Sequence, residues 1–384
     1  MNLNGTLSDE ETIIRESLEE YCRRNIAPAY EGWIREREFP RSLMKGLSQL
    51  ILGATVLPKD EGGVDEVTLG LLSETMGKYE VPVPAFLTMH FAKMLPLISD
   101  ENTRENYVNR YLSGDLVLCG AFTEPGFGSD SASITTEAHL ENNKYVLNGE
   151  KAFVSSPGIA DAHIISVRTS EMHEERKHKG ISLILVDSKE SGLETYEDEN
   201  MASLFRGDFG RVRLNNVRTP QGNIIGRENE GFAILMNILG IQRVHVGLYA
   251  IGLAMSALEE AIEYAKTRKV FGEYISKYEA ISFRIADDWS KLQSARMMAF
   301  KALALNDSGL DNSAESSVVK GFGCEAAFEA VSHALQTLGA SGYVKTSSLE
   351  RKFRASRGFL IGDGTPEVQK LIITRKLFGR SFAP

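Results

Sequence analysis

The sequence predicts an α+β protein with an N-terminal helical domain, a middle antiparallel β domain and a C-terminal four-helix bundle. Apolar residues recur at helical spacing in the first and last parts of the 384-residue chain. Between them lie short alternating runs bounded by Gly, Asn, Asp or Pro, which are typical of antiparallel strands. We place the domains at residues 1–116, 117–228 and 229–384, in keeping with a length that allows two or three domains.

The N-terminal domain begins with a helix that follows Ser8. Glu11 lies three residues further on, and this spacing is typical of a capping box, in which both side chains accept hydrogen bonds from free backbone amides. Pro40 opens a second helix, and helical spacing continues through 67–79 and 84–97. We therefore expect helices throughout this domain.

The pattern changes near residue 116. A buried strand is predicted at 117–122, and the charged segment Glu171–Lys179 is predicted to be a solvated hairpin loop. Shorter strands are predicted around 145–147, 163–167, 181–186 and 210–214.

The helical period returns near residue 231. Long helices are predicted from Phe232 to about Lys269, from Glu279 to about Asn306, and from Ser313 to about Leu338. A fourth begins with Thr365 as the N-cap and Pro366 at the first helical position. Long helices with short connections pack as a bundle.

Composition excludes several classes of function. A net charge of −9 argues against a nucleic-acid partner and an anionic membrane surface, because both demand a basic face. The three cysteines are far apart and form no Cys-x-x-Cys pair, so we expect buried, reduced thiols and no metal site. The N-terminus lacks the pattern of a signal peptide and the run Ile181–Val186 is too short to span a bilayer, so a cytoplasmic location without a membrane partner is expected.

A glycine-rich loop, Phe122–Asp130, follows the first predicted strand. Gly126 and Gly128 let backbone amides approach a ligand closely, and Thr123 and Ser129 supply hydroxyl donors. A Gly-x-Gly pattern alone most often marks a tight turn. Because no Lys follows and no long helix begins here, the loop matches neither a phosphate loop nor a Rossmann fingerprint.

Five strings of the sequence, taken together, narrow the interpretation. They are TEPGFGSD at 123–130, LNGEKAFVS at 147–155, RKVFG at 268–272, QTLGASGY at 336–343 and DGTPEVQ at 363–369. In identity and order they closely resemble the signatures of the acyl-CoA dehydrogenase family, and the resemblance spans about residues 10 to 380. The helix–strand–helix order predicted from periodicity agrees with it independently.

The resemblance implies an FAD between the β domain and the helical bundle. Phe122 and Thr123 match positions that line the isoalloxazine ring, and Ser129, in the loop with Gly128, matches the position that bonds the flavin pyrophosphate. These four residues are expected to bind the cofactor.

The second string departs from the family, which usually carries Trp-Ile-Thr where this chain has Phe153-Val154-Ser155. The resemblance implies that Ser155 keeps the hydroxyl that bonds flavin N5 and that Phe153 keeps an aromatic wall without the indole N–H. The alternative is that Phe153 and Ser155 are ordinary strand residues; the surrounding motif favours cofactor binding.

The third and fourth strings match segments that reach the FAD of a neighbouring subunit. Arg268 is expected on the pyrophosphate, with Phe271, Gln336 and Gly339 as further contacts, although a lone Arg at a helix end is more often a surface charge that offsets the helix dipole. The shared cofactor implies a homo-oligomer, with a tetramer built as a dimer of dimers favoured. In the last string, Thr365 and Glu367 match positions near the adenosine half of the cofactor.

The family's reaction removes the pro-R α-proton of an acyl thioester with a carboxylate while the β-hydride moves to flavin N5. Most members carry this base in a Tyr-Glu-Gly-Thr turn, which here reads Gly362-Asp363-Gly364-Thr365, so Asp363 is the expected base. The alternative is a common Asp-Gly turn before a helix. Some branches place the base immediately before the Arg that matches Arg243; that residue is Gln242, which cannot act as a base.

We expect Gln242, Arg243, Gly362 and Gly364 to lie at the substrate. Asp is one methylene shorter than Glu, so its carboxylate falls about 1.5 Å short of the usual place. A misplacement of this size costs on the order of 100-fold in rate unless the substrate binds differently. Because Gly362 replaces the Tyr, the sequence favours a substrate with a bulkier or more polar group near Cα.

The carrier of the acyl group is open, since Gly240 stands where the family often has an acidic residue near the pantetheine. CoA and an acyl carrier protein, as in the assembly lines of secondary metabolism, are both options. The leading hypothesis is an FAD-dependent acyl-thioester dehydrogenase served by an electron-transfer flavoprotein or another acceptor. Its alternatives are a flavin oxidase or monooxygenase, since the nitroalkane-oxidising branch also has an Asp base, and a non-catalytic flavoprotein.

Overall fold

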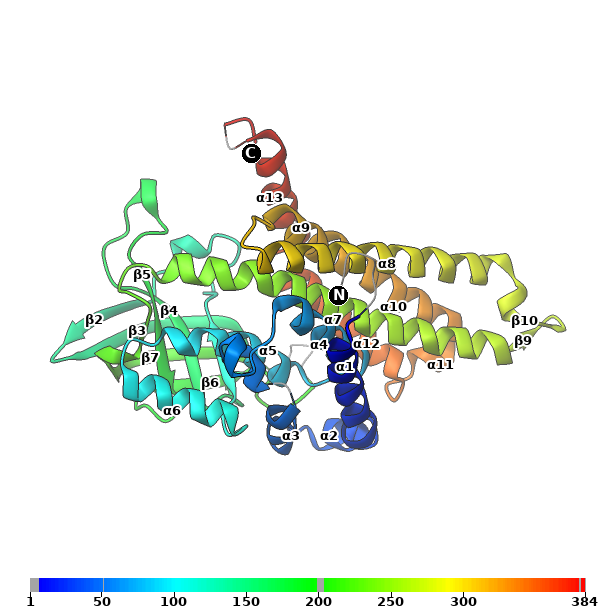
Figure 1. The fold of residues 1–384 in the computed structure, drawn as a ribbon, viewed down its shortest axis with the longest axis horizontal. Helices are drawn as coiled ribbons and strands as arrows, with labels where there is room; N and C mark the ends of the chain where they lie inside the picture. Colours follow the sequence, from blue (N-terminus) through cyan, green and yellow to red (C-terminus); the bar gives the residue numbers. More distant parts are fainter. Residues whose placement is uncertain (1–6, 51, 199–203, 380, 384) are drawn as a thin grey trace. The chain divides into compact units, whose positions relative to one another are not determined.

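The computed structural model describes residues 7–50, 52–198, 204–379 and 381–383, and Figure 1 shows its ribbon. The chain divides into two compact units that interleave along the sequence. The helical unit comprises Met1–Ala27, Asp65–Val81 and Leu239–Pro384, and the sheet unit comprises Pro28–Val64 and Pro82–Ile238. The boundaries predicted after residues 116 and 228 stay a prediction.

The sheet unit is built on an eight-stranded sheet in the order β6-β7-β3-β2-β4-β5-β8, with β1 paired to β4 outside this path. Its pairs are antiparallel except that β1 runs parallel to β4, and β2 meets β4 in a single parallel pair. The strands are β1 (Leu118–Ala121), β2 (Glu137–Glu141), β3 (Lys144–Ser155), β4 (Ala162–Arg168), β5 (Ile181–Asp187), β6 (Leu193–Glu197), β7 (Phe209–Pro220) and β8 (Ile224–Ile225).

The centre of this sheet is buried on both faces. All residues of β4 are buried, as are all but the last of β5, which explains why their sequences are nearly continuous apolar runs. Helix α5 (Val83–Phe91) packs on β1, where Leu118 N donates a hydrogen bond of 3.0 Å to Thr88 Oγ1. Helices α2 (Tyr30–Glu36), α3 (Ser42–Leu50) and α6 (Glu101–Leu112) complete the unit.

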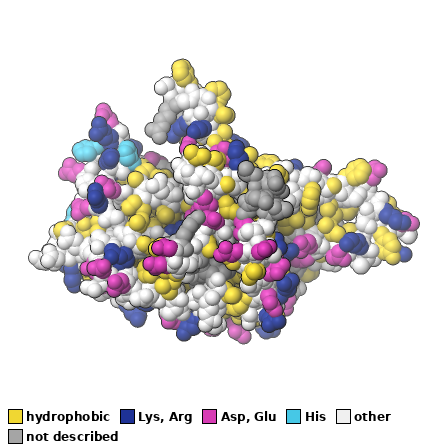
Figure 2. Space-filling model, in the orientation of Figure 1, with side chains coloured by type: hydrophobic (Ala, Val, Ile, Leu, Met, Phe, Trp, Pro, Cys, Tyr) yellow, Lys and Arg dark blue, Asp and Glu magenta, His cyan; other side chains and the backbone are white. Residues whose placement is uncertain are grey.

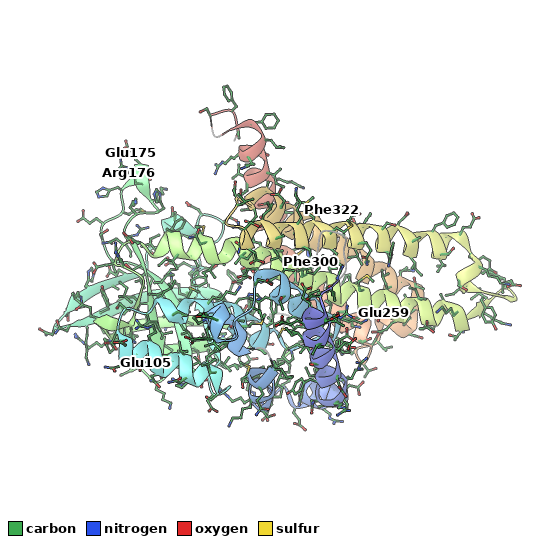
Figure 3. All side chains as sticks on the ribbon, viewed as in Figure 1. Glu105, Glu175, Arg176, Glu259, Phe300 and Phe322 are labelled. Carbon is green, nitrogen blue, oxygen red and sulfur yellow. The ribbon has the colours of Figure 1, made fainter. Side chains whose placement is uncertain are left out.

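The charged segment between β4 and β5 is the solvated hairpin loop that its sequence predicted. A short 3-10 turn, Glu174–Arg176, lies at its tip, where Figure 2 shows charged and histidine side chains and Figure 3 labels Glu175 and Arg176. At the base of the loop, Arg168 Nη1 donates to the carbonyls of Lys177 and Lys179 at 3.1 and 2.7 Å. The Arg168 side chain therefore holds the loop through the backbone carbonyls of Lys177 and Lys179.

The helical unit confirms the predicted start of its first helix. Glu11 N donates to Ser8 Oγ at 3.2 Å and Ser8 N donates to Glu11 Oε2 at 2.7 Å, which together form the capping box. The main helices are α1 (Asp9–Tyr21), α4 (Glu66–Lys78), α7 (Gly231–Thr267), α8 (Glu279–Asp307), α10 (Cys324–Leu338), α12 (Ser348–Ile361) and α13 (Pro366–Phe378).

One core cluster of the helical unit is made by the four helices α7, α8, α10 and α12 (Figure 1), and a second is made by α4, α7, α8 and residue Val319. Small side chains such as Ala257, Ala261 and Ala330 fill the centre of the first cluster and let the helices approach closely. The fourth helix that the sequence predicted is present as α13, which begins at Pro366 with Thr365 as the N-cap residue. The helix that joins α7, α8 and α10 in the first cluster is α12, which was not predicted because most of its residues are polar and only a few, such as Leu349 and Leu360, are buried.

The predicted helix from Ser313 to Leu338 is interrupted. It consists of α9 (Ser313–Val318), a π-helical turn η9 (Val319–Gly323) and α10. A Cβ added at Gly247 of α7 would lie 2.5 Å from Val319 Cγ1, so a glycine is needed where α7 meets this turn. The sequence pattern did not reveal this five-residue turn.

Two expectations about single features can be compared with the structure. All three cysteines, Cys22, Cys119 and Cys324, are free and buried, as predicted. Among the described residues one helix, α7, has the length and composition of a membrane span, and 72% of its most apolar stretch is buried inside the protein. Burial of this kind is typical of the core helix of a globular fold.

Candidate active site

The glycine-rich loop leaves β1 as a tight hairpin. Glu124 N donates to Phe127 O, and Phe127 N donates to Glu124 O, both at 3.1 Å. A Cβ added at Gly126 would meet no atom within 4 Å, and one added at Gly128 would meet only Thr123 Cγ2 at 4.0 Å. Since packing does not require these glycines, their exposed backbone is free to receive a ligand.

A buried ion pair holds the loop against β3. Lys151 Nζ, on a fully buried side chain, lies 2.8 Å from Glu124 Oε1, and Glu124 also accepts hydrogen bonds from Thr135 N at 2.8 Å and Thr136 N at 2.9 Å. Burial alone would raise the pKa of Glu124, but the charge of Lys151 and these hydrogen bonds outweigh it and lower the pKa to about 2. Ala152 N donates to Thr123 O at 2.9 Å, so the loop and β3 are fastened side by side.

At this junction β3 has a bulge that presents Phe153. The pairing of β3 with β7 shifts register between Lys151 and Val154, and Phe153 adopts a φ of +53° with its side chain 57% exposed. A left-handed backbone at an aromatic residue costs about 1 to 3 kcal/mol, and exposure gives no packing in return. The strain therefore points to a ligand that the ring would cover.

The other predicted flavin residues of the sheet unit lie nearby in the chain and are partly open. Phe122, Thr123 and Ser155 are half-buried, and Ser129 is exposed. The Phe122 ring packs edge-on against Phe91, with ring centroids 5.9 Å apart. Open glycines, reachable hydroxyls and a strained aromatic residue together fit the demands of a flavin.

In the helical unit, the structure brings together three residues that the sequence singled out. Gln242 Nε2 donates a hydrogen bond of 3.1 Å to Asp363 Oδ2, and Arg243 Nε donates one of 3.3 Å to Asp363 O. Asp363 has a φ of +55° in the turn between α12 and α13, a conformation that Asp tolerates better than most residues. Burial raises the pKa of Asp363, and the nearby Lys320, Gln242 and Arg243 each oppose this rise.

Two further residues hold the same turn and were not predicted. Gln369 Nε2 and Lys320 Nζ donate to the carbonyl of Gly364 at 2.9 and 3.2 Å. Both side chains are fully buried. Lys320 comes here on the π-helical turn and no sequence signal indicated it, whereas Gln369 ends the string at 363–369, in which no role had been predicted for this residue.

The residues expected at a neighbouring subunit's cofactor lie on the surface of the helical unit. Arg268, Gln336 and Gly339 are exposed, and the Phe271 side chain is 95% exposed. Thr365 occupies the N-cap position of α13, as predicted, although its side chain makes no capping hydrogen bond, and Glu367 is exposed in the first turn.

Three family models match the chain in succession. The N-terminal domain of acyl-CoA dehydrogenase matches residues 8–115, the middle domain 119–217 and the C-terminal domain 229–378. The chain belongs to the acyl-CoA dehydrogenase family. The predicted family, the three-part fold of helices, sheet and helical bundle, and an oxidoreductase of the type that acts on CH–CH groups are thereby confirmed.

Relatives and solved structures cover almost the whole chain. An acyl-CoA dehydrogenase of Bacillus subtilis is 32% identical over 378 residues, which is 97% of this chain and 99% of that protein. A caffeyl-CoA reductase-Etf complex subunit of Acetobacterium woodii is 30% identical over 376 residues, 96% of this chain and 98% of that one. An FAD complex of PigA superposes with a TM-score of 0.90 at 26% identity and covers 99% and 100%.

The predicted cofactor, FAD, is confirmed at the level of the acyl-CoA dehydrogenase family, whose solved members include FAD complexes. The roles of the individual site residues stay predictions. The buried pair Glu124–Lys151 was missed as part of the site, although a lysine inside an apolar strand was a signal that could have revealed it.

Proposed function

We propose that this member of the family is an FAD-dependent dehydrogenase of an acyl thioester, in which Asp363 abstracts the α-proton. The observation that carries the proposal is the Asp363 carboxylate, which Gln242 orients through Oδ2 while Arg243 holds the backbone carbonyl of the same residue. A carboxylate whose pKa is raised by its surroundings is suited to accept a proton near neutral pH.

Bound FAD supplies the acceptor for the β-hydride. The residues of this chain would bind and orient it: Phe153 would cover the ring, the hydroxyls of Thr123 and Ser155 would bond its polar edge and N5 respectively, and Ser129 with Gly128 would receive the pyrophosphate. The buried pair Glu124–Lys151 keeps the loop and β3 at a fixed spacing. Geometry of this kind is what positions a hydride acceptor against a substrate.

The substrate that we propose carries a bulky or polar group near Cα. Asp363 is shorter than the usual Glu, and the position beside it, Gly362, is exposed. A Cβ added at Gly362 would meet only Gly358 O, at 3.8 Å, so the chain itself leaves this space open. Gly364 gives the turn its second positive φ, +92°, which places the backbone beside the base.

The acyl group is carried by CoA or by an acyl carrier protein. Relatives are named acyl-CoA dehydrogenases, which supports CoA. Gly240 brings no acidic side chain to the position where the family often has one near the pantetheine, which supports a carrier protein of secondary metabolism as the alternative tether. The name of the Acetobacterium woodii relative, a subunit of an Etf complex, supports an electron-transfer flavoprotein as the acceptor.

The Asp base also favours a second candidate, a flavin oxidase or monooxygenase like the nitroalkane-oxidising branch. The reoxidation rate of the reduced enzyme in air separates the two. Slow reoxidation supports a dehydrogenase, whereas reoxidation as fast as turnover would support an oxidase.

Replacement of the base tests the proposal. Asp363→Asn should lower kcat by about 100- to 10,000-fold, because the amide cannot accept the α-proton. Anaerobic bleaching of the flavin absorbance, measured with CoA thioesters and with carrier-protein thioesters, reports the reaction and identifies the tether.

The FAD content of Asp363→Asn, measured on the purified protein, serves as the control and should equal that of wild type. An Asp363→Asn protein that retained full turnover would contradict the assignment of the base. A protein that bleached with neither type of thioester would contradict the proposed reaction as a whole.

A further inference from the structure

Lys320 is a fully buried lysine that lies on the π-helical turn η9. On one side the turn packs closely on α7, where a Cβ at Gly247 would come within 2.5 Å of Val319 Cγ1. On the other side a Cβ at Gly321 would lie 3.4 Å from Gln369 Cβ of α13. A π-helical turn widens the helix by one residue and is frequently found at functional sites, and here it directs Lys320 into the turn between α12 and α13.

Burial of an ammonium is costly unless an opposing charge and hydrogen-bond acceptors surround it. Lys320 Nζ donates to Gly364 O at 3.2 Å, so one proton is satisfied by the residue that directly follows Asp363. A carbonyl does not neutralise the charge. The carboxylate of Asp363 is the acidic group of this turn, and its charge interacts with that of Lys320.

We propose that Lys320 is a positioning residue, which holds the base turn through the Gly364 carbonyl and supplies a fixed positive charge that keeps the Asp363 carboxylate ionised. The inference rests on the proposed function, in which Asp363 is the base. Lys320 acts through the turn and through space rather than by contact with the substrate.

Among the groups around Asp363, Lys320 lowers the pKa of the carboxyl most strongly. Arg243 of α7 also lowers the pKa of Asp363 through its charge, but its contribution is smaller than that of Lys320. Gln242 and Gln369 are neutral. Cys324 of α10 is neutral as well, because burial raises the pKa of its thiol to about 11.

The direction of the effect follows from these charges. Burial raises the pKa of Asp363, and Lys320 makes the largest opposing contribution. Loss of the positive charge therefore raises the pKa further, so the base is protonated over a wider range and activity disappears at a higher pH as the solution is acidified.

Three substitutions separate charge from hydrogen bonding. Lys320→Met removes both, Lys320→Gln keeps a donor for the Gly364 carbonyl without the charge, and Lys320→Arg keeps the charge. The readout is the pH profile of kcat/KM, measured on the holoenzyme. Lys320→Met and Lys320→Gln should both move the acid limb to higher pH by about one unit or more, and Lys320→Arg should move it less. Lys301→Met, which removes an exposed lysine 3.0 Å from Glu315, is the control and should keep the wild-type profile.

A double-mutant cycle tests the coupling without any substrate. Thermal unfolding of the holoenzyme is measured for wild type, Lys320→Gln, Asp363→Asn and the double variant, at pH 8 and at pH 5. If the charges interact, the loss of Tm in the double variant at pH 8 is smaller than the sum of the single losses, and the difference shrinks at pH 5.

The two readouts distinguish the possible failures. Additive losses at both pH values together with a wild-type acid limb in Lys320→Met and Lys320→Gln would overturn the inference. Non-additive losses in a protein that oxidises no thioester would leave the Lys320–Asp363 coupling established and overturn the proposed function instead.

Discussion

At the scale of single residues, Gln242 is an amide at a position where some branches of the family carry a carboxylate base. Its Nε2 donates to Asp363 Oδ2 at 3.1 Å. A donor to the ionised carboxylate stabilises it and so lowers the pKa of Asp363 against the effect of burial. In the proposed mechanism, Gln242 therefore stabilises the ionised form of Asp363.

This contact makes a prediction about pH. Gln242→Met removes the donor, so the pKa of Asp363 rises, by about one unit at most, and the acid limb of kcat/KM moves to higher pH. Gln242→Glu places a second carboxylate beside the first, and since the two then share a proton the shift should be larger. Profiles measured for both variants that coincide with wild type would contradict a role for Gln242 in tuning the base.

The same residues show what could be predicted from the sequence. Asp363 stands in the last of the five strings, Gln242 and Arg243 match family positions, and the structure brings the three within hydrogen-bonding distance. Lys320 could not be predicted, because a lysine in a helix is usually exposed. Gln369 ends the last string, but its contact with Gly364 depends on how α13 packs and could not be predicted either.

At the scale of secondary structure, periodicity predicted elements but not their irregularities. The strands and long helices carry regular apolar spacing, and the structure contains them. The π-helical turn η9 and the bulge of β3 are short local departures from regular spacing, and the sequence pattern did not reveal either of them. Both irregular elements hold residues of the candidate site, Lys320 and Phe153.

A substitution at Phe153, in the strained bulge of β3, should affect the stability of the protein and its affinity for FAD in different ways. Phe153→Gly should leave the stability of the apoprotein unchanged or raise it by about 1 kcal/mol, because glycine adopts a φ of +53° without cost. It should weaken FAD binding, because the aromatic wall is lost. Thermal unfolding of the apoprotein and fluorescence titration with FAD measure the two effects.

Leu140→Gly, at an exposed strand position of β2 in the same sheet, is the matched control. It should lower the stability, since glycine weakens a regular strand, and leave FAD binding unchanged. Should Phe153→Gly lose stability to the same extent as Leu140→Gly and bind FAD normally, Phe153 would be an ordinary strand residue after all.

At the scale of the whole molecule, the helical unit exposes many large apolar side chains to solvent. Exposed apolar groups in such numbers are typical of interfaces between proteins. They include Phe271 at 95% exposure, Tyr343 at 78%, Met297 at 74%, Leu377 at 72%, Phe378 at 64%, Phe283 at 61% and Ile361 at 61%. Two of them, Phe271 and Tyr343, lie in the strings expected to reach the cofactor of a neighbouring subunit.

We therefore predict that assembly and cofactor binding are linked. Phe271→Asp places a charge where a partner would bury an aromatic ring, so it should dissociate the oligomer, which we expect to be a tetramer, and lower the affinity for FAD in the same protein. Arg268→Ala should lower the affinity for FAD while the oligomer persists, because it removes a phosphate contact and little apolar area. Light scattering after size exclusion gives the mass and the flavin absorbance gives the occupancy. A Phe271→Asp protein that stayed oligomeric with full FAD would show that this surface serves neither purpose, whereas a monomer that kept all its FAD would show that each subunit holds its cofactor alone.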